Sequence, residues 1–177
     1  MSKPTLATVW LDGCSGCHMS FLDLDERLIT VAEKADLVYS PLVDAKEFPN
    51  LVDITLVEGA VSSEDDLRKI KMVRERTRIL VSLGDCAVTS NVPGMRNPFH
   101  YSDVYDRAYR ENVTCDPGIP DQVVPPLLPY SRPVHEFVAV DVFVPGCPPS
   151  ADVISFVLSE LLEGRKPELS PRVRFGA

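Results

Sequence analysis

The sequence predicts an α/β protein whose parallel, doubly wound sheet lies between two layers of helices. Two observations lead to this prediction. Segments with strand-like apolar runs alternate with segments of helical periodicity along most of the 177 residues. The apolar runs are also nearly continuous, as in strands that are buried on both faces. We therefore expect a three-layer fold that forms a single domain over residues 1–177, interrupted by one long insertion at about residues 87–135.

The strands are predicted from short runs that are rich in branched apolar residues. In chain order, they cover residues 5–11, 36–43, 51–57, 78–83 and 137–144. The second of these runs is the weakest, because Pro41 lacks the N–H group that an interior strand needs. We therefore expect this strand at an edge of the sheet.

The helices are predicted from apolar spacing and from residues typical of helix ends. In chain order, they cover residues 18–33, 62–77 and 148–164. Either Ser62 or Ser63 is expected to cap the second helix, whose first turn is acidic. Prolines at the start of the third helix and Gly164 past its last turn define its ends.

The insertion holds many of the 16 prolines of the chain. It breaks the alternation of strands and helices, and it contains one short predicted helix near residues 103–112. Long insertions of this kind are often functional. We expect the segment to lie on the surface and to contact a partner.

The charge and composition narrow the classes of function. A net charge of −8 disfavours binding to nucleic acid, whose phosphates are also negative. No apolar run approaches the roughly 20 residues of a membrane span, and the amino terminus does not resemble a signal peptide. We therefore expect a cytoplasmic protein, in which five reduced cysteines serve as ligands or catalysts rather than as disulfides.

Four of the cysteines follow predicted strands. Cys14 and Cys17 follow the first strand, Cys86 follows residues 78–83, and Cys147 follows the last strand. The carboxyl ends of parallel strands lie at one edge of a sheet, where ligands bind in such folds. We therefore expect these four thiols to converge. Cys115 lies in the insertion and is expected to be a bystander.

Four thiolates at one edge suit tetrahedral zinc or a [4Fe–4S] cluster. Structural zinc sites usually combine two C-x₂-C pairs, whereas this chain has one pair. The Cys147-Pro148 sequence is also met in cluster-binding runs, so the pattern favours the cluster. A zinc-stabilised scaffold is an alternative. A thiol–disulfide enzyme using Cys14 and Cys17 is another, but it leaves Cys86 and Cys147 without a role.

Two further side chains are candidates for accessory roles at this edge. Glu58 ends the strand at 51–57, so it is either an ordinary carboxylate at a helix start or a group that moves protons or binds iron beside a cluster. His18 follows Cys17 directly, and it is either a structural hydrogen-bonding residue or a ligand.

Four motifs in order, C-S-G-C-H, V-E-G-A, G-D-C-A and P-G-C-P-P, resemble the small subunit of [NiFe] hydrogenases, most closely the soluble NAD-reducing branch. The resemblance runs from about residue 5 to residue 165. It implies a flavodoxin-like fold and one [4Fe–4S] cluster bound by Cys14, Cys17, Cys86 and Cys147.

The resemblance also implies that the chain is the electron-transfer subunit of a hydrogenase and has no catalytic residue of its own. The nickel–iron site is then expected in a large subunit, and further clusters, FMN and NAD in diaphorase subunits. The chain itself has no G-x-G-x-x-G pattern for NAD. The 20 kDa subunit of respiratory complex I, which is linked to quinone, is the second family that the motifs resemble. Its two adjacent cysteines differ from Cys14 and Cys17, which have two residues between them.

Overall fold

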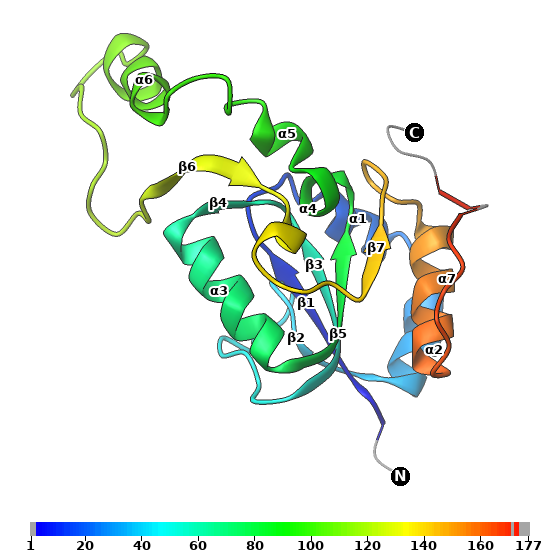
Figure 1. The fold of residues 1–177 in the computed structure, drawn as a ribbon. Coiled ribbons are helices and arrows are strands. Elements are labelled where there is room, and N and C mark those ends of the chain that lie inside the picture. The colour runs from blue at the N-terminus through cyan, green and yellow to red at the C-terminus, as the bar shows by residue number, and fades with distance from the viewer. Residues whose placement is uncertain (1–2, 171, 174–177) are drawn as a thin grey trace.

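A computed structural model describes residues 3–170, 172 and 173. Its main sheet has five parallel strands in the order β2-β1-β3-β5-β7 (Figure 1). The strands are β1 (Thr5–Trp10), β2 (Asp36–Tyr39), β3 (Val52–Glu58), β5 (Thr77–Leu83) and β7 (Val142–Val144). This order is that of flavodoxin-like sheets, so the predicted fold class is confirmed. The weakly predicted second strand, β2, does lie at the edge.

Helices cover both faces of the sheet, as Figure 1 shows: α2 and α7 lie side by side on one face, and α3 lies on the other. In chain order, the helices outside the insertion are α1 (Gly16–Leu22), α2 (Arg27–Lys34), α3 (Glu64–Glu75) and α7 (Ala151–Leu162). Two short helices flank the insertion, α4 (Asp85–Thr89) at its start and the 3-10 helix η2 (Val134–Glu136) at its end. In the part of the chain that the structure describes, no helix combines the length and the apolarity needed to cross a membrane.

Two hydrophobic cores explain why the strands are apolar on both faces. Leu56 and Val81 belong to the core beneath α1, α2 and α7, whereas their neighbours Val57 and Leu80 belong to the core on the other side of the sheet. Successive side chains of a strand point to opposite faces, so each central strand contributes to both cores. Apolar packing therefore covers both faces of the sheet.

Three predicted elements were wrong in extent. The strand expected over residues 36–43 is limited to the four residues of β2, so it ends before Pro41. The helix expected over residues 18–33 is two helices, α1 and α2, separated by a turn in which Asp25 adopts a positive φ of 49°. A left-handed residue cannot continue a right-handed helix, and aspartate tolerates this conformation better than most residues.

The strand expected over residues 137–144 is limited to the three residues of β7. Phe137, Val138 and Val140 pack against the α3-side core without pairing in the sheet, which explains their apolar pattern. The Asp141 carboxylate then accepts the Leu80 N–H at 2.7 Å, so a side chain rather than a strand backbone satisfies that donor.

The insertion is folded rather than irregular. It begins within α4, ends within η2, and contains α5 (Asn91–Gly94), α6 (Tyr101–Asp106), the π-helix η1 (Arg107–Glu111) and β6 (Leu127–Arg132). The short helix expected near 103–112 corresponds to α6 and η1. Strand β6 pairs antiparallel with β4 (Val61–Ser63) in a second sheet, which the sequence pattern did not predict.

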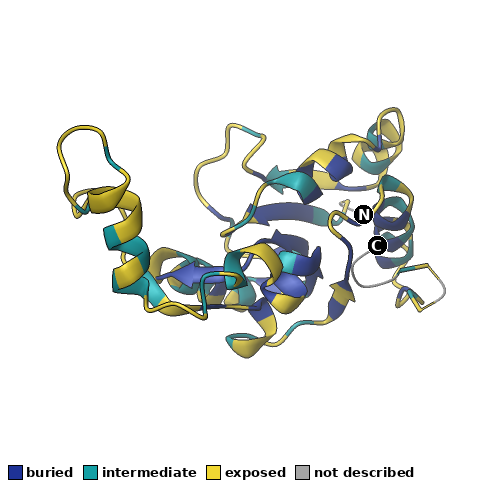
Figure 2. Ribbon diagram, turned by 90° about the horizontal axis from the view of Figure 1, so that it is seen from above, coloured by how far each residue is buried: buried dark blue, intermediate teal, exposed yellow. Residues whose placement is uncertain are grey.

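We call residues 91–126 the arm. It projects from the sheet, and Figure 2 shows its helices to be exposed or partly exposed. None of the residues of α5, α6 and η1 is buried. The arm is fixed at its base, where Arg96 donates to the carbonyl groups of Ser62 and Leu128, and the Asn97 amide pairs with the backbone of Ser131. The arm is therefore positioned by polar contacts, while the side chains of Val92, Met95 and Phe99 stay exposed.

Helix α3 begins with a reciprocal cap, which gives a test of the fold. The Ser63 hydroxyl accepts the Asp66 N–H at 3.1 Å, and the Asp66 carboxylate accepts the Ser63 N–H at 3.0 Å. Replacing Ser63 by alanine should lower the free energy of unfolding by about 1 kcal/mol, measured by urea denaturation.

Ser159→Ala is the matched control, because Ser159 is exposed in the interior of α7 and alanine favours helix interiors. This control should not lower the free energy of unfolding. Equal losses in the two variants would contradict the capping role of Ser63.

Candidate functional site

Three loops at the carboxyl edge of the sheet carry four thiols. The loop after β1 carries Cys14 and leads into α1 with Cys17, the loop after β5 leads into α4 with Cys86, and the loop after β7 carries Cys147. Because β1, β5 and β7 are parallel strands of one sheet, all three loops leave it at the same edge.

Buried hydrogen bonds hold the three loops together. The Asp85 carboxylate accepts the Gly146 N–H at 2.7 Å, and the Asp85 N–H donates to the Gly146 carbonyl at 2.8 Å. The Ser20 hydroxyl of α1 donates to the Pro149 carbonyl at 2.5 Å. The loop of Cys147 is therefore tied to both of the other cysteine-bearing segments. Sequence reasoning found no such role for Asp85 or Ser20, and only their neighbouring cysteines could have drawn attention to them.

The four thiols share one electrostatic neighbourhood. Burial raises the pKa of the Cys17 thiol most, and the nearby charges of Glu58, Cys86, Cys14 and Cys147 raise that pKa further. Burial is likewise the main cause that raises the pKa of Cys86. Four thiolates at this place repel one another, so they require a positively charged group among them. Cys115 lies elsewhere, exposed on the arm.

Three of these thiols accept hydrogen bonds from N–H groups. The pairs are Gly16 N–H with Cys14 at 3.4 Å, Val92 N–H with Cys86, and the Asn91 side-chain amide with Cys147 at 3.5 Å. Donors aimed at sulfur stabilise the negative charge of thiolates that bind metal. Cys17 is buried, whereas Cys14 and Cys147 are exposed, so the group of thiols opens toward the surface.

A glycine provides the space for the buried thiol. A Cβ atom at Gly84 would lie 2.2 Å from the Cys17 sulfur, and Gly84 has a positive φ of 83°. Both the space and the backbone conformation therefore require glycine at this position.

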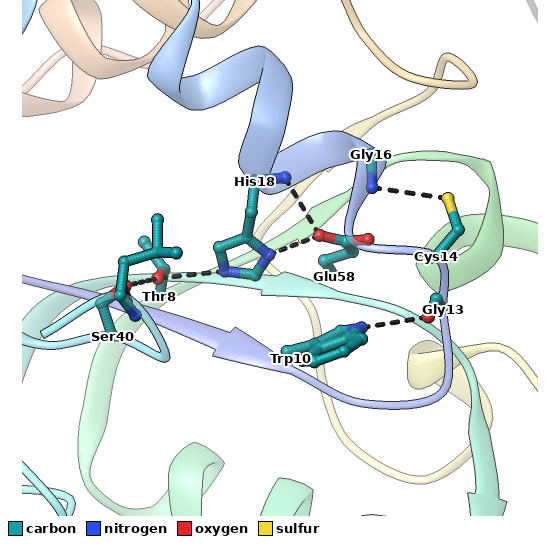
Figure 3. Close-up of polar contacts among 9 residues, drawn as sticks. Thr8, Trp10, Gly13, Cys14, Gly16, His18, Ser40 and Glu58 are labelled. Atoms are coloured by element: carbon teal, nitrogen blue, oxygen red, sulfur yellow. Dashed lines mark hydrogen bonds and ion pairs between the residues drawn. The ribbon is translucent and has the colours of Figure 1, made fainter.

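Glu58 and His18 form a buried polar chain beneath the start of α1 (Figure 3). The Glu58 carboxylate accepts the His18 N–H at 3.0 Å and also contacts Nδ1 of the His18 ring. The other ring nitrogen lies 3.1 Å from the Thr8 hydroxyl, which donates to Ser40 at 2.8 Å. Both ring nitrogens of His18 are thus engaged within the protein, and Glu58 lies between the His18 ring and Cys14 (Figure 3).

The arrangement differs from a closed site for one ion. Within residues 3–170, 172 and 173, no three side chains among His, Cys, Asp and Glu lie close enough to share a single metal ion. A four-iron cluster instead offers one iron to each thiolate. The observed thiols, their N–H donors and the glycine beside Cys17 fit such a group.

Comparison with known proteins identifies relatives over most of the chain. The family model described as "NADH ubiquinone oxidoreductase, 20 Kd subunit" matches residues 14–161. The delta subunit of the NAD-reducing hydrogenase HoxS of Cupriavidus necator is 44% identical over 168 residues, which cover 92% of this chain and 80% of that subunit. One subunit of the F420-non-reducing hydrogenase vhu of Methanocaldococcus jannaschii is 36% identical over 93% of this chain, which spans 58% of that subunit.

Solved structures agree with these matches. A chain of an NAD+-reducing [NiFe]-hydrogenase in the H2-reduced state superposes with a TM-score of 0.93 at 39% identity, covering 98% of this chain and 99% of that one. A chain of the Dm. baculatum [NiFeSe]-hydrogenase shares the fold, with a TM-score of 0.59 at 19% identity over 93% of this chain and 62% of that one. This chain therefore belongs to the family of the 20 kDa subunit of NADH ubiquinone oxidoreductase, and its resemblance to the small subunits of [NiFe] hydrogenases, stated above from four motifs, is confirmed.

Proposed function

We propose that this chain is the electron-transfer subunit of an NAD-reducing [NiFe] hydrogenase and holds one [4Fe–4S] cluster on Cys14, Cys17, Cys86 and Cys147. The observation that carries the proposal is the convergence of these thiols from three loops tied together by Asp85 and Ser20. When bound, the cluster would accept and release single electrons. The relatives that are hydrogenase subunits support the assignment.

The surrounding residues perform two tasks in this proposal. Gly84 leaves room for the buried thiol of Cys17, which anchors the site against the body of the protein. Glu58 and His18 fix the first turn of α1, because the buried carboxylate accepts a backbone N–H of that turn. The N–H donors and the degree of burial then tune the potential at which electrons are exchanged.

The exposed side of the site indicates where a partner binds. Cys14 and Cys147 are exposed, and Trp10 and Met19 beside the first cysteine loop are 43% and 56% exposed. Tryptophan and methionine are enriched at protein interfaces. We therefore place the large subunit, with its nickel–iron site, over this edge of the sheet.

The base of the arm extends the same surface. Val92 contacts the Cys86 thiol through its N–H, and the exposed apolar side chains of Val92, Met95 and Phe99 lead away from it along the chain. A partner that covers the thiols therefore also meets these side chains. Burying them would offset the cost of ordering the interface.

The remaining cofactors belong to other subunits in this proposal. Diaphorase subunits would supply further clusters, FMN and the NAD site, in an assembly located in the cytoplasm, where thiols stay reduced for cluster binding. A quinone-linked role like that of the 20 kDa subunit of complex I is the second candidate, favoured by the family match at residues 14–161. The spacing of Cys14 and Cys17 and the 44% identity to the HoxS subunit favour the hydrogenase.

The ligand set is tested by two cysteine variants. Cys147→Ser should lose most of the iron and acid-labile sulfide of the small subunit in the complex purified without oxygen, because one of the four ligands of its cluster is removed. Cys115→Ser should retain the wild-type content, because Cys115 is exposed on the arm.

Loss of iron from Cys115→Ser together with a full content in Cys147→Ser would show that the ligand set is wrong. Zinc in place of iron in the wild type would instead support the zinc-stabilised scaffold.

The space beside Cys17 gives a second test. Gly84→Ala should reduce the iron content and the visible absorbance, because the added methyl group displaces the Cys17 sulfur. The positive φ of this residue adds a strain of about 1–3 kcal/mol. Gly118→Ala is the control, since a Cβ atom at Gly118 meets no atom within 4 Å. Equal iron contents in the two variants would refute the proposed role of Gly84.

The partner surface is tested with charged substitutions on the arm. Met95→Asp and Phe99→Asp together should abolish co-purification of the large subunit, because these side chains are 71% and 62% exposed and an interface would have to bury two carboxylates. The iron content of the small subunit should be unchanged. Leu51→Asp is the control, because Leu51 is an exposed apolar residue just before β3, at the edge formed by the amino ends of the strands. This variant should leave the complex intact. A stable complex in the arm variant would exclude this surface.

A further inference from the structure

We propose that Asn91 is a positioning residue that raises the reduction potential of the cluster through its hydrogen bond to Cys147. This inference rests on the proposed function, since it requires the four thiols to bind the cluster. Its starting point is the 3.5 Å contact between the Asn91 side-chain amide and the Cys147 sulfur. Among the described hydrogen bonds to these thiols, it alone comes from a side chain; the others come from the backbone.

The sequence after Cys147 explains why a side chain is needed. The Cys14 sulfur accepts the N–H of Gly16, two residues further along the chain, at 3.4 Å. The two residues that follow Cys147 are Pro148 and Pro149, and proline has no N–H group. The loop therefore cannot satisfy its own sulfur in the way the Cys14 loop does. Asn91, which lies 56 residues away in the sequence, supplies the missing donor.

The backbone around Asn91 is held in place before any ligand binds. The Ser90 N–H donates to the Cys86 carbonyl at 3.0 Å, and the Ser90 hydroxyl lies 2.9 Å from that of Ser131. The following residue, Val92, donates its N–H to the Cys86 sulfur. Residues 90–92 are therefore held in place by hydrogen bonds, and they donate to the thiols of two different loops, Cys86 and Cys147. A donor held in this way loses little conformational freedom when it acts on a bound group.

The direction of the effect follows from charge. Adding an electron makes the cluster and its thiolates more negative, and an N–H group pointing at sulfur stabilises the more negative state. The hydrogen bond therefore favours reduction. Asn91 is exposed in the isolated chain, so a subunit that covers this edge would exclude water and strengthen the bond.

The test compares midpoint potentials in the assembled complex, by redox titration monitored with electron paramagnetic resonance. Asn91→Leu keeps the approximate size of the side chain but removes the donor. It should lower the ratio of reduced to oxidised cluster at a fixed potential about two- to tenfold, as expected for one hydrogen bond. The upper end corresponds to a shift of about 59 mV to more negative potential for one electron. Asn91→Asp, which replaces the donor by a negative charge, should shift the potential further in the same direction.

Two further variants complete the design. Asn112→Leu alters another exposed asparagine of the arm and should leave the potential unchanged. Asn91→Gln retains an amide donor and should return the potential toward that of the wild type. Iron analysis accompanies each titration, so that every potential refers to a loaded cluster.

The outcomes separate the two proposals. Loaded Asn91→Leu or Asn91→Asp complexes with the wild-type potential would overturn the role of Asn91 and leave the cluster assignment standing. If Asn91→Leu fails to load, Asn91→Asp decides in the same way, with Asn91→Gln as the variant expected to keep a potential near that of the wild type. A wild-type complex whose small subunit contains no iron would overturn the proposed function itself, and with it this inference.

Discussion

The bond between the Asp85 carboxylate and the Gly146 N–H is the constraint on which the rest of the site depends. It joins the loops after β5 and β7, which the sheet brings to the same edge but does not by itself hold at one separation. Asp85 is buried, so water does not compete for this bond. The thiols of Cys86 and Cys147 take their relative positions from it. The Ser20 bond to Pro149 extends the same fixation to α1 and Cys17.

The charges of the site make its thiolate form depend on a bound, positively charged group. Burial and mutual repulsion hold the pKa of the Cys17 thiol well above its usual range, so the free protein disfavours the thiolate form that metal ligation requires. In the proposed function, the positive charge of bound iron would reverse this balance. The buried carboxylate of Glu58 adds to the negative charge and therefore increases the dependence on the bound group.

The sheet with its two cores and the arm contribute differently to the site. The sheet and its two cores hold the cysteine loops, and both faces of the sheet are filled by apolar side chains. The arm contributes little to this packing, yet it starts with the residues that contact Cys86 and Cys147. The thiol site and the proposed partner surface are therefore continuous along the chain. A partner docking there would meet the thiols and the arm together.

The sequence by itself determined the parallel sheet, the position of four cysteines at its carboxyl edge and the resemblance to hydrogenases. Strand periodicity and short motifs depend only on residues that are close together in the sequence. It did not reveal the break at Asp25 or the short extent of the last strand, since apolar spacing reports burial and not the partner that provides it. The hydrogen bonds of Asp85 and Asn91 were decided only by tertiary structure. Each acts on a residue more than 50 positions away, 61 for Asp85 and 56 for Asn91, and only the folded sheet brings these distant loops into contact.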